Sequence, residues 1–594
     1  MEQERVRAPI GQRAGKRPIR LRFAIGLNRH RQPVIASRAK QSRAALRVLY
    51  RDYFVAQSAP CNDTALGWSK SALAFALCTS FFMFHHAASA EPAPKRGGTL
   101  VFAVDAEPPN YDCHANFSFV FIHPIIPHYS TLLKFDTANY PQIVGDLAES
   151  WNVSADRRTY TFKLRRNVLF HDGSPLTSAD VKASYDRITR PPEGVLSVRQ
   201  ADYSAISGID TPDPATVVFH LQWPDAAMLA NFASPWNCIY SAARLKEDPL
   251  FPKTHLLGTG PFVFVEHVKK DHWTGKRWDK YFLAGKPYLD GYRADFVAGA
   301  AAVKAMENGR IMAQFRSFTP AERDEMVETV GDRVLVRESP WITYLALVFN
   351  AHRPPFDDAR VRRALSLAID RWHGAETLAD TTFLKYVGGL MRPGTAMSIP
   401  EAELVTIPGF SRDIVASRAE ARRLLAEAGV PGLAFTLTNR NDVPIPYGPA
   451  GDFVMAAWRE ISVQVTQEML STKDWQTALE TGRFTAATDL AADYFDDPTI
   501  QLARYVSRDL SPINHSGSTD RYLDALFIGQ AISTDIRQRA NIVREFERHA
   551  LTEAFTVPLL WWNRIIVTAE KFKGWNVSPS HYIGQDLADA WLQD

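Results

Sequence analysis

The sequence predicts an α/β protein built from more than one domain, and three observations point to it. Residues 159–164 alternate polar and apolar side chains, which is the pattern of a half-buried strand. Residues 419–429 (AEARRLLAEAG) instead carry apolar side chains at helical spacing and end on a glycine. Strand and helix patterns alternate in this way along 594 residues, a length that exceeds what one hydrophobic core organises.

The stretch from Pro141 to Thr189 is the most informative part of the chain. It reads PQIVGDLAESWNVSADRRTYTFKLRRNVLFHDGSPLTSADVKASYDRIT. Turn-forming residues flank the strand of residues 159–164. Thr177 stands three residues before Asp180, the spacing of a capping box, and Val181, Tyr185 and Ile188 then share one face of a helix. We therefore predict a compact β-β-turn-α unit.

Composition and charge exclude some partners. With 46% hydrophobic and 22% charged residues, the chain is typical of globular proteins. Residues 1–90 hold 15 Lys/Arg against 4 Asp/Glu, whereas residues 91–594 hold 53 against 61. The body of the protein is therefore mildly acidic, which argues against a nucleic-acid partner.

The first 90 residues read as a leader. Residues 66–90 combine Lys70, an apolar run of residues 72–84 and an Ala-x-Ala site, so we predict a secretory signal peptide that is cleaved after Ala90. Cys78 lacks a convincing lipobox, which favours a soluble periplasmic product over a lipoprotein. Residues 1–65 are Arg-rich and without hydrophobic periodicity. We interpret them as a non-structural extension, from a misassigned start codon or an unusually long n-region.

Four motifs together resemble a known family. After the block DLAESW…TYTFKLR…FHDG…PLT…SYDRI within residues 141–189, the chain carries GTGPF at 258–262, P-Y-L-D at 287–290 and FN at 349–350 followed by PFDDARVRRALSLAID at 355–370. They resemble the bacterial extracellular solute-binding proteins of the peptide/nickel type, family 5, which serve ABC importers. The glycines of GTGPF fit neither nucleotide-loop spacing, so we interpret them as a tight loop that enters a strand.

The resemblance implies a type II periplasmic-binding-protein fold, similar to dipeptide and oligopeptide binders, with two lobes, three domains and hinge closure around the ligand. It also implies domain boundaries. Residues 91–140 and 258–340 form the principal domain of lobe I, 141–257 its accessory domain, 341–557 lobe II, and 558–594 the return to lobe I.

Within residues 341–557 the patterns predict further elements. A helix carries Val361, Leu365 and Ala368, and residues 435–438 form a strand. We expect an open loop over residues 444–450, followed by a helix over residues 453–461.

No catalytic or metal-binding constellation is evident. The chain has no H-E-x-x-H, G-x-S-x-G or Walker motif, so we predict no catalytic residue, metal ligand or cofactor. His114, His123 and His128 have irregular spacing, which we interpret as polar surface rather than a metal site. Cys113 and Cys238 can pair in an oxidising compartment, but the sequence leaves that open.

The resemblance also points to ligand-binding residues. Asp493, in the motif ADY at 492–494, matches the aspartate that holds a peptide's α-ammonium group, although Leu490 stands where oligopeptide binders tend to carry Trp. Arg440, at the end of the strand of residues 435–438, matches the arginine that clamps the ligand carboxylate in dipeptide binders. Tyr494 and Asn439, their neighbours in the sequence, complete the predicted ligand-binding set.

The predicted function is that of a monomeric periplasmic solute-binding component of an ABC importer. Its partners are a short peptide or amino-acid-derived solute and the permease subunits in the inner membrane, with no nucleic acid. The resemblance leaves other ligands open, namely nickel chelates, glutathione, opines, oligosaccharides and haem. A secreted hydrolase is the alternative of another class, and no motif supports it.

Overall fold

A computed structural model describes residues 93–593 of the chain. The predicted signal peptide, its cleavage after Ala90 and the extension over residues 1–65 lie outside this range. Within it, no helix has the length and apolar character needed to cross a membrane.

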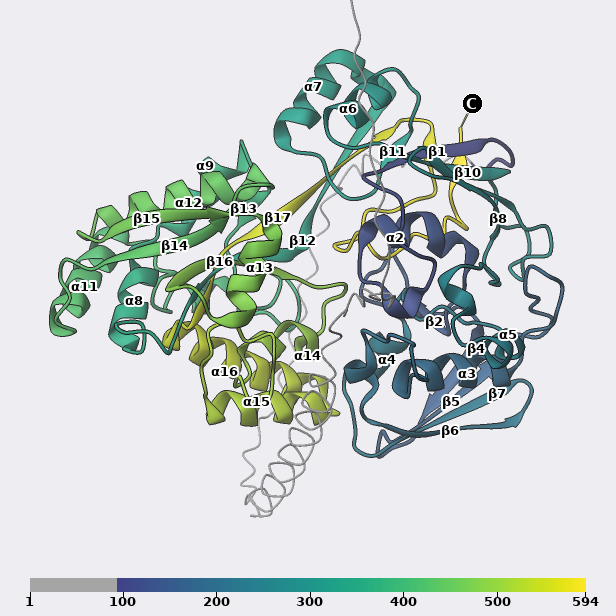
Figure 1. Cartoon of the computed structure of the whole chain (residues 1–594), viewed down its shortest axis with the longest axis horizontal. Helices are drawn as coiled ribbons and strands as arrows, with labels where there is room; N and C mark the ends of the chain where they lie inside the picture. Colours follow the sequence, from purple (N-terminus) through teal and green to yellow (C-terminus); the bar gives the residue numbers. More distant parts are fainter. Residues whose placement is uncertain (1–92, 594) are drawn as a thin grey trace, which may run out of the picture. The chain divides into compact units, whose positions relative to one another are not determined.

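A mixed sheet of eleven strands is the backbone of the fold (Figure 1). Its order is β15-β14-β16-β12-β17-β11-β1-β10-β9-β8, and β13 pairs with β17. The strands are β1 (Thr99–Val104), β8 (Phe262–Val268), β9 (His272–Arg277), β10 (Gly291–Phe296), β11 (Ala313–Gln314), β12 (Val334–Phe349), β13 (Leu384–Tyr386), β14 (Ala434–Arg440), β15 (Gln464–Leu470), β16 (Ala486–Ala492) and β17 (Thr556–Ala569).

The hydrophobic cores divide the chain into two lobes. Four cores are built only from residues between 341 and 562, which we call the second lobe. The other three are built from residues 93–340 and 563–593, the first lobe, with few exceptions. Phe495 of the second lobe is one of them, because it is fully buried in a first-lobe core.

Two long strands, β12 and β17, connect the lobes. They pair antiparallel, and each has one end in a first-lobe core and the other in a second-lobe core. Their register shifts between Pro340 and Tyr344, at the boundary between the lobes. The chain therefore runs between the two groups of cores along each of these strands.

The predicted β-β-turn-α unit is present in the first lobe. Thr177 and Asp180 form the expected capping box, and the backbone N–H of Thr177 donates to the Asp180 carboxylate at 2.7 Å. The helix that follows, α3 (Ser178–Thr189), packs on a four-stranded sheet of order β4-β5-β7-β6. These strands are β4 (Ala148–Val153), β5 (Thr159–Leu164), β6 (Ile206–Asp213) and β7 (Thr216–Leu221).

The GTGPF segment is a tight loop that leads into β8, as predicted. A Cβ atom on Gly258 would lie 2.0 Å from the carbonyl oxygen of His128, and one on Gly260 would lie 2.5 Å from the same backbone. Only glycine allows this close approach between two chain segments. The two glycines therefore allow the loop to pack closely against the backbone of His128.

The remaining elements of the first lobe are short. Its helices are α2 (Phe119–Ile125), α4 (Met228–Phe232), α5 (Ala242–Glu247), α6 (Ala300–Glu307) and α7 (Pro320–Val330). Two strand pairs complete it, β2 (Leu133–Phe135) with β3 (Ile143–Gly145) and β18 (Phe572–Lys573) with β19 (Trp591–Leu592).

Helices cover the sheet in the second lobe, and two of them correct the sequence-based expectations. The helix α11 begins at Ile414 rather than Ala419, because Asp413 caps it by accepting from the backbone N–H of Ala416. The helices are α8 (Ala359–Leu367), α9 (Arg371–Ala379), α10 (Glu401–Leu404), α11 (Ile414–Glu427), α12 (Pro444–Arg459), α13 (Thr472–Thr481), α14 (Pro498–Gln501), α15 (Arg521–Ile532) and α16 (Ile536–Glu553).

The open loop predicted over residues 444–450 is wrong. This segment is the start of α12, with non-helical backbone only at Ile445, and the helix ends at Arg459. The prolines misled the prediction. A proline in the first turn costs little, because the first N–H groups of a helix have no partner within it.

Candidate functional site

Asp493 lies at the boundary between the lobes. It is the first residue after β16, and its backbone N–H donates to the carbonyl oxygen of Ile342 at 3.2 Å. Its side chain is 10% exposed and forms an ion pair with Arg504, Oδ1 to Nη2 at 3.5 Å. Burial raises the pKa of the Asp493 carboxyl, and the nearby Arg504 lowers it by less. The carboxylate therefore needs its cationic partner.

Arg504, which sequence reasoning missed, lies in the short 3₁₀ helix η6 (Ala503–Tyr505). Its side chain is 11% exposed, and its Nη1 also donates to the carbonyl oxygen of Leu490 at 3.4 Å. One sequence signal could have revealed it. An arginine in the apolar run LARYV implies a buried cation, which requires a buried anion nearby.

Arg440 has the opposite surroundings. It is the last residue of β14, and its guanidinium lies 4.0 Å from the ring centroid of Tyr447 and 5.1 Å from that of Trp475. Its polar contact is a long one, from Nη1 to the Thr472 hydroxyl at 3.4 Å. The buried Nε has no hydrogen-bond partner, and the residue forms no ion pair with a carboxylate of the described chain. Burial lowers its pKa, so an incoming anion would be stabilising here.

Asn439 is fully buried and holds this region together. Its amide nitrogen donates to the carbonyl oxygen of Tyr447 at 2.8 Å. Its amide oxygen accepts from the Thr488 hydroxyl at 2.8 Å and from the backbone N–H of Arg440 at 2.9 Å. The structure thus gives Asn439 a role in positioning Arg440 and Tyr447, while ligand contact by Asn439 stays a prediction.

Tyr494 joins the two lobes. Its hydroxyl donates to the Asp202 carboxylate of the first lobe at 2.7 Å. The next residue, Phe495, packs 5.4 Å from the ring of Phe135, and the backbone N–H of Asp496 donates to the Tyr140 hydroxyl at 2.7 Å. The segment that carries Asp493 is therefore docked on the first lobe.

Arg316 of the first lobe adds positive charge within electrostatic range of Arg440. Its guanidinium lies 4.5 Å from the Phe119 ring centroid and 3.6 Å from the Asp105 carboxylate, and its side chain is 41% exposed. Burial lowers the pKa of Arg440 and raises the pKa of Tyr447 to about 12, both in the second lobe. The positive charge of Arg316 makes a smaller contribution, which lowers both pKa values. The two arginines are thus within electrostatic range of each other.

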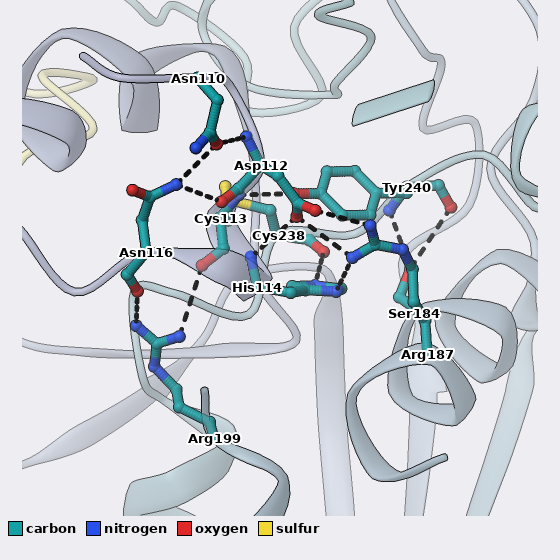
Figure 2. Close-up of a disulfide and its surroundings, with 10 residues drawn as sticks. All are labelled: Asn110, Asp112, Cys113, His114, Asn116, Ser184, Arg187, Arg199, Cys238 and Tyr240. Carbon is teal, nitrogen blue, oxygen red and sulfur yellow. Dashed lines mark hydrogen bonds and ion pairs between the residues drawn. A yellow bond between two sulfur atoms is a disulfide. The ribbon is translucent and has the colours of Figure 1, made fainter. Parts of the chain in front are cut away.

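A disulfide braces the first-lobe side of this boundary (Figure 2). Cys113 and Cys238 are bonded, which settles the pairing that the sequence left open. The carbonyl oxygens of Cys113 and Asn116 accept from the guanidinium of Arg199. That guanidinium also lies 6.0 Å from the Tyr494 ring centroid, so the disulfide loop supports a residue at the inter-lobe contact.

The prediction that three histidines form polar surface is wrong. His114, His123 and His128 are at most 2% exposed, and burial lowers the pKa of each to about 3. Each donates a hydrogen bond from a ring N–H to a backbone carbonyl oxygen, those of Cys238, His581 and Phe262. Aromatic neighbours and hydrogen bonds to backbone carbonyls allow neutral imidazoles to pack in a core. The irregular spacing of the three histidines along the sequence does not reveal these partners.

Other candidate sites in the described residues do not coincide with this region. No cluster of His, Cys, Asp or Glu between residues 93 and 593 has the geometry to hold a metal ion. A cavity of about 290 Å³ lies in the first lobe, lined by residues that include Lys134, Asp146 and Asp586. None of the four predicted ligand-binding residues lines this cavity. We therefore place the candidate site at the lobe boundary, where the charged groups of Asp493, Arg504 and Arg440 lie.

Comparison with solved structures supports the fold. The chain aligns with a periplasmic binding protein, AgaA from A. tumefaciens R10 in complex with agropinic acid, at a TM-score of 0.70 and 24% identity, covering 84% of this chain and 99% of that one. A Helicobacter pylori binding protein, DppA, in complex with the peptide STSA gives 0.70 and 21%, with the same coverage. At these identities the likeness shows the fold alone.

Curated relatives are also binding proteins. The glutathione-binding protein GsiB of Pectobacterium atrosepticum is 30% identical over 311 residues, which is 52% of this chain and 57% of the relative. The di/tripeptide-binding protein 2 of Pseudomonas aeruginosa is 28% identical over 390 residues, 61% and 68% of the two chains. The chain thus spans little more than half the length of the first of these relatives.

The chain also matches a protein family as a whole. Residues 142–509 match the family described as bacterial extracellular solute-binding proteins, family 5. This range includes the β-β-turn-α unit, Arg440, Asp493 and Arg504. The chain belongs to the bacterial extracellular solute-binding proteins, family 5.

Proposed function

We propose that the protein is the periplasmic solute-binding component of an ABC importer. It binds a short peptide or an amino-acid-derived solute between its lobes and delivers the solute to the permease subunits of the inner membrane. A signal peptide cleaved after Ala90 exports it, and it acts as a monomer. The observation that carries this proposal is the family match over residues 142–509, which extends from the first lobe into the second.

The geometry supports ligand binding at the lobe boundary. Arg440 offers a planar guanidinium without an anionic partner, which is suited to a ligand carboxylate. Tyr447 and Trp475 give it an aromatic floor, and aromatic faces of this kind also receive apolar side chains. Asp493 and Tyr494 place a second charged group and the inter-lobe contact on the same segment.

The function also requires a change of conformation. The contacts of Tyr494 and Phe495 with the first lobe hold the lobes together, and a ligand that bridges the lobes adds to them. Binding then shifts the equilibrium toward the closed form that a permease recognises.

Native mass spectrometry of protein purified from the periplasm tests the proposal. We expect a co-purified small molecule that is amino-acid-derived, and small-angle scattering should show a smaller radius of gyration when the stripped protein is saturated with it. Chromatographic evidence that the protein consumes this molecule would contradict the proposal, because a binding protein returns its ligand unchanged.

A further inference from the structure

Three carboxylates near the candidate site each have a cationic or imidazole partner within the protein. Asp493 pairs with Arg504 at 3.5 Å, and Asp105 pairs with Arg316 at 3.6 Å. Asp489, four residues before Asp493, accepts from or pairs with His515 Nδ1 at 2.8 Å. None of these three is free for a ligand ammonium group, whereas Asp442, two residues after Arg440, accepts only from the backbone N–H and the hydroxyl of Thr472 among the described residues.

The pair of Asp493 and Arg504 belongs wholly to the second lobe. Both side chains are about nine-tenths buried, and Leu490 holds the arginine through a backbone carbonyl. An α-ammonium group that approached Asp493 would have to share the carboxylate with a fixed guanidinium a few ångströms away. Two like charges at that distance in a buried site repel strongly.

Arg440 shows the reverse situation. Its guanidinium is half-buried against two aromatic rings and forms no ion pair with a carboxylate of the described residues. Arg316 adds a second positive charge from the first lobe; it pairs with Asp105 at 3.6 Å, and its side chain is 41% exposed. A carboxylate between the lobes would be attracted by both positive charges.

We propose that Arg504 takes the place of a ligand ammonium group at Asp493, so that the site selects a carboxylate-bearing solute whose α-amine is acylated or absent. This inference rests on the proposed function and narrows its ligand class. Arg440, assisted by Arg316, receives the carboxylate. Asp493 then acts as the counter-ion that holds Arg504 in place.

Matched ligand probes test the inference on the wild-type protein. Three dipeptides, Ala-Ala, Ala-Phe and Ala-Glu, are each titrated calorimetrically in free, N-acetylated and C-terminally amidated form. For a dipeptide that binds, we expect the acetylated form to bind at least about threefold more tightly than the free form, and the amide to bind at least about tenfold more weakly than the free form.

The outcomes separate the two proposals. If the acetylated form binds less than about threefold more tightly than the free form, the site does not select against an ammonium group, and the inference fails while the proposed function stands. An amide that binds as tightly as the acid overturns the role given to Arg440. If no probe binds in any form, the peptide-like ligand class of the proposed function is contradicted, and this inference with it.

Variants of Arg504 provide the second test. In Arg504→Met the Asp493 carboxylate has lost its partner, so the free dipeptide should bind at least about tenfold more tightly than its acetylated form. Arg504→Lys keeps the charge and should keep the ratio of the parent. A methionine variant that folds, judged by its thermal transition, and still shows the parent's ratio would overturn the inference. If it does not fold, the wild-type ratio decides.

Discussion

Arg440 and Arg504 are two partly buried arginines of the second lobe with contrasting surroundings. Arg504 is paired with Asp493 and held by a backbone carbonyl, whereas Arg440 rests on aromatic rings without an anion. A buried charge that has its partner in the protein contributes to the folded state. A charge left without one is available to a ligand, so the comparison separates groups that serve stability from groups that serve binding.

The largest expected effect tests the paired side. Arg504→Ala leaves the Asp493 carboxylate buried without a cation, which should lower the free energy of unfolding by about 3–5 kcal/mol. Chemical denaturation of the ligand-free protein measures it. Arg539→Ala is the matched control, because Arg539 forms a similarly buried pair with Asp497 at 2.8 Å. Arg539→Ala should lower the free energy of unfolding by a similar amount without changing the preference between free and acetylated peptides. An Arg504→Ala variant as stable as the parent would contradict the contrast between Arg504 and Arg440.

The pH dependence of the stability lost on replacing Arg504 sharpens the comparison of the two arginines. Burial already raises the pKa of Asp493, and Arg504→Met raises it further by removing the charge that lowers it. A carboxyl whose folded pKa exceeds its unfolded value stabilises at low pH and loses that contribution as the pH rises through the folded pKa. The gap in unfolding free energy between parent and Arg504→Met should therefore be largest near pH 8 and shrink toward pH 5. The double variant Asp493→Asn/Arg504→Met should abolish this change, and a gap that widens on acidification would contradict it.

The unpaired side should behave differently. Arg440→Ala removes a charge-assisted contact with the ligand, worth about 1.5–3 kcal/mol, which is about ten- to a hundredfold in dissociation constant. The free energy of unfolding without ligand should fall by only about 1 kcal/mol, since mainly aromatic stacking is lost. Arg412→Ala is a control for stacking, because Arg412 lies 3.6 Å from the Trp372 ring centroid elsewhere in the second lobe. Calorimetry that finds equal ligand affinity in Arg440→Ala and the parent would break the comparison.

The smallest effect concerns the contact between the lobes. Tyr494→Phe removes the hydrogen bond to Asp202 and keeps the ring, at a cost of about 1 kcal/mol. Because this bond joins the lobes, the loss should appear in ligand affinity and in the scattering radius of the saturated protein. Tyr522→Phe, whose hydroxyl contacts Glu545 on the surface of one lobe, should change neither.

Much of the fold could be predicted from the sequence because its signals are local. The capping box of Thr177 and Asp180 and the alternation over residues 159–164 lie within single elements. The prediction failed where a partner far away decides the outcome. The core position of His128, for instance, depends on Phe262 and Trp273, which lie far along the chain.

The candidate site was predictable only in part for the same reason. Family motifs point to Asp493 and Arg440 by their place along the chain. The partner of Asp493 comes from the single-turn 3₁₀ helix η6, which is too short for a periodic pattern to indicate which way Arg504 faces. The charge that a ligand encounters depends on that partner, and so it required the structure.

The two long strands between the lobes have a mechanical consequence. Along β12 and β17 the ladder is regular from Val334 to Pro340 and resumes at Tyr344, so the interrupted stretch between them is the compliant section of an otherwise stiff two-stranded ribbon. Torsion concentrated there would turn one lobe against the other without breaking hydrogen bonds on either side. The resistance of this ribbon to twisting would set how far the lobes are apart without ligand. It would also set how much of the free energy of ligand binding is used to close them.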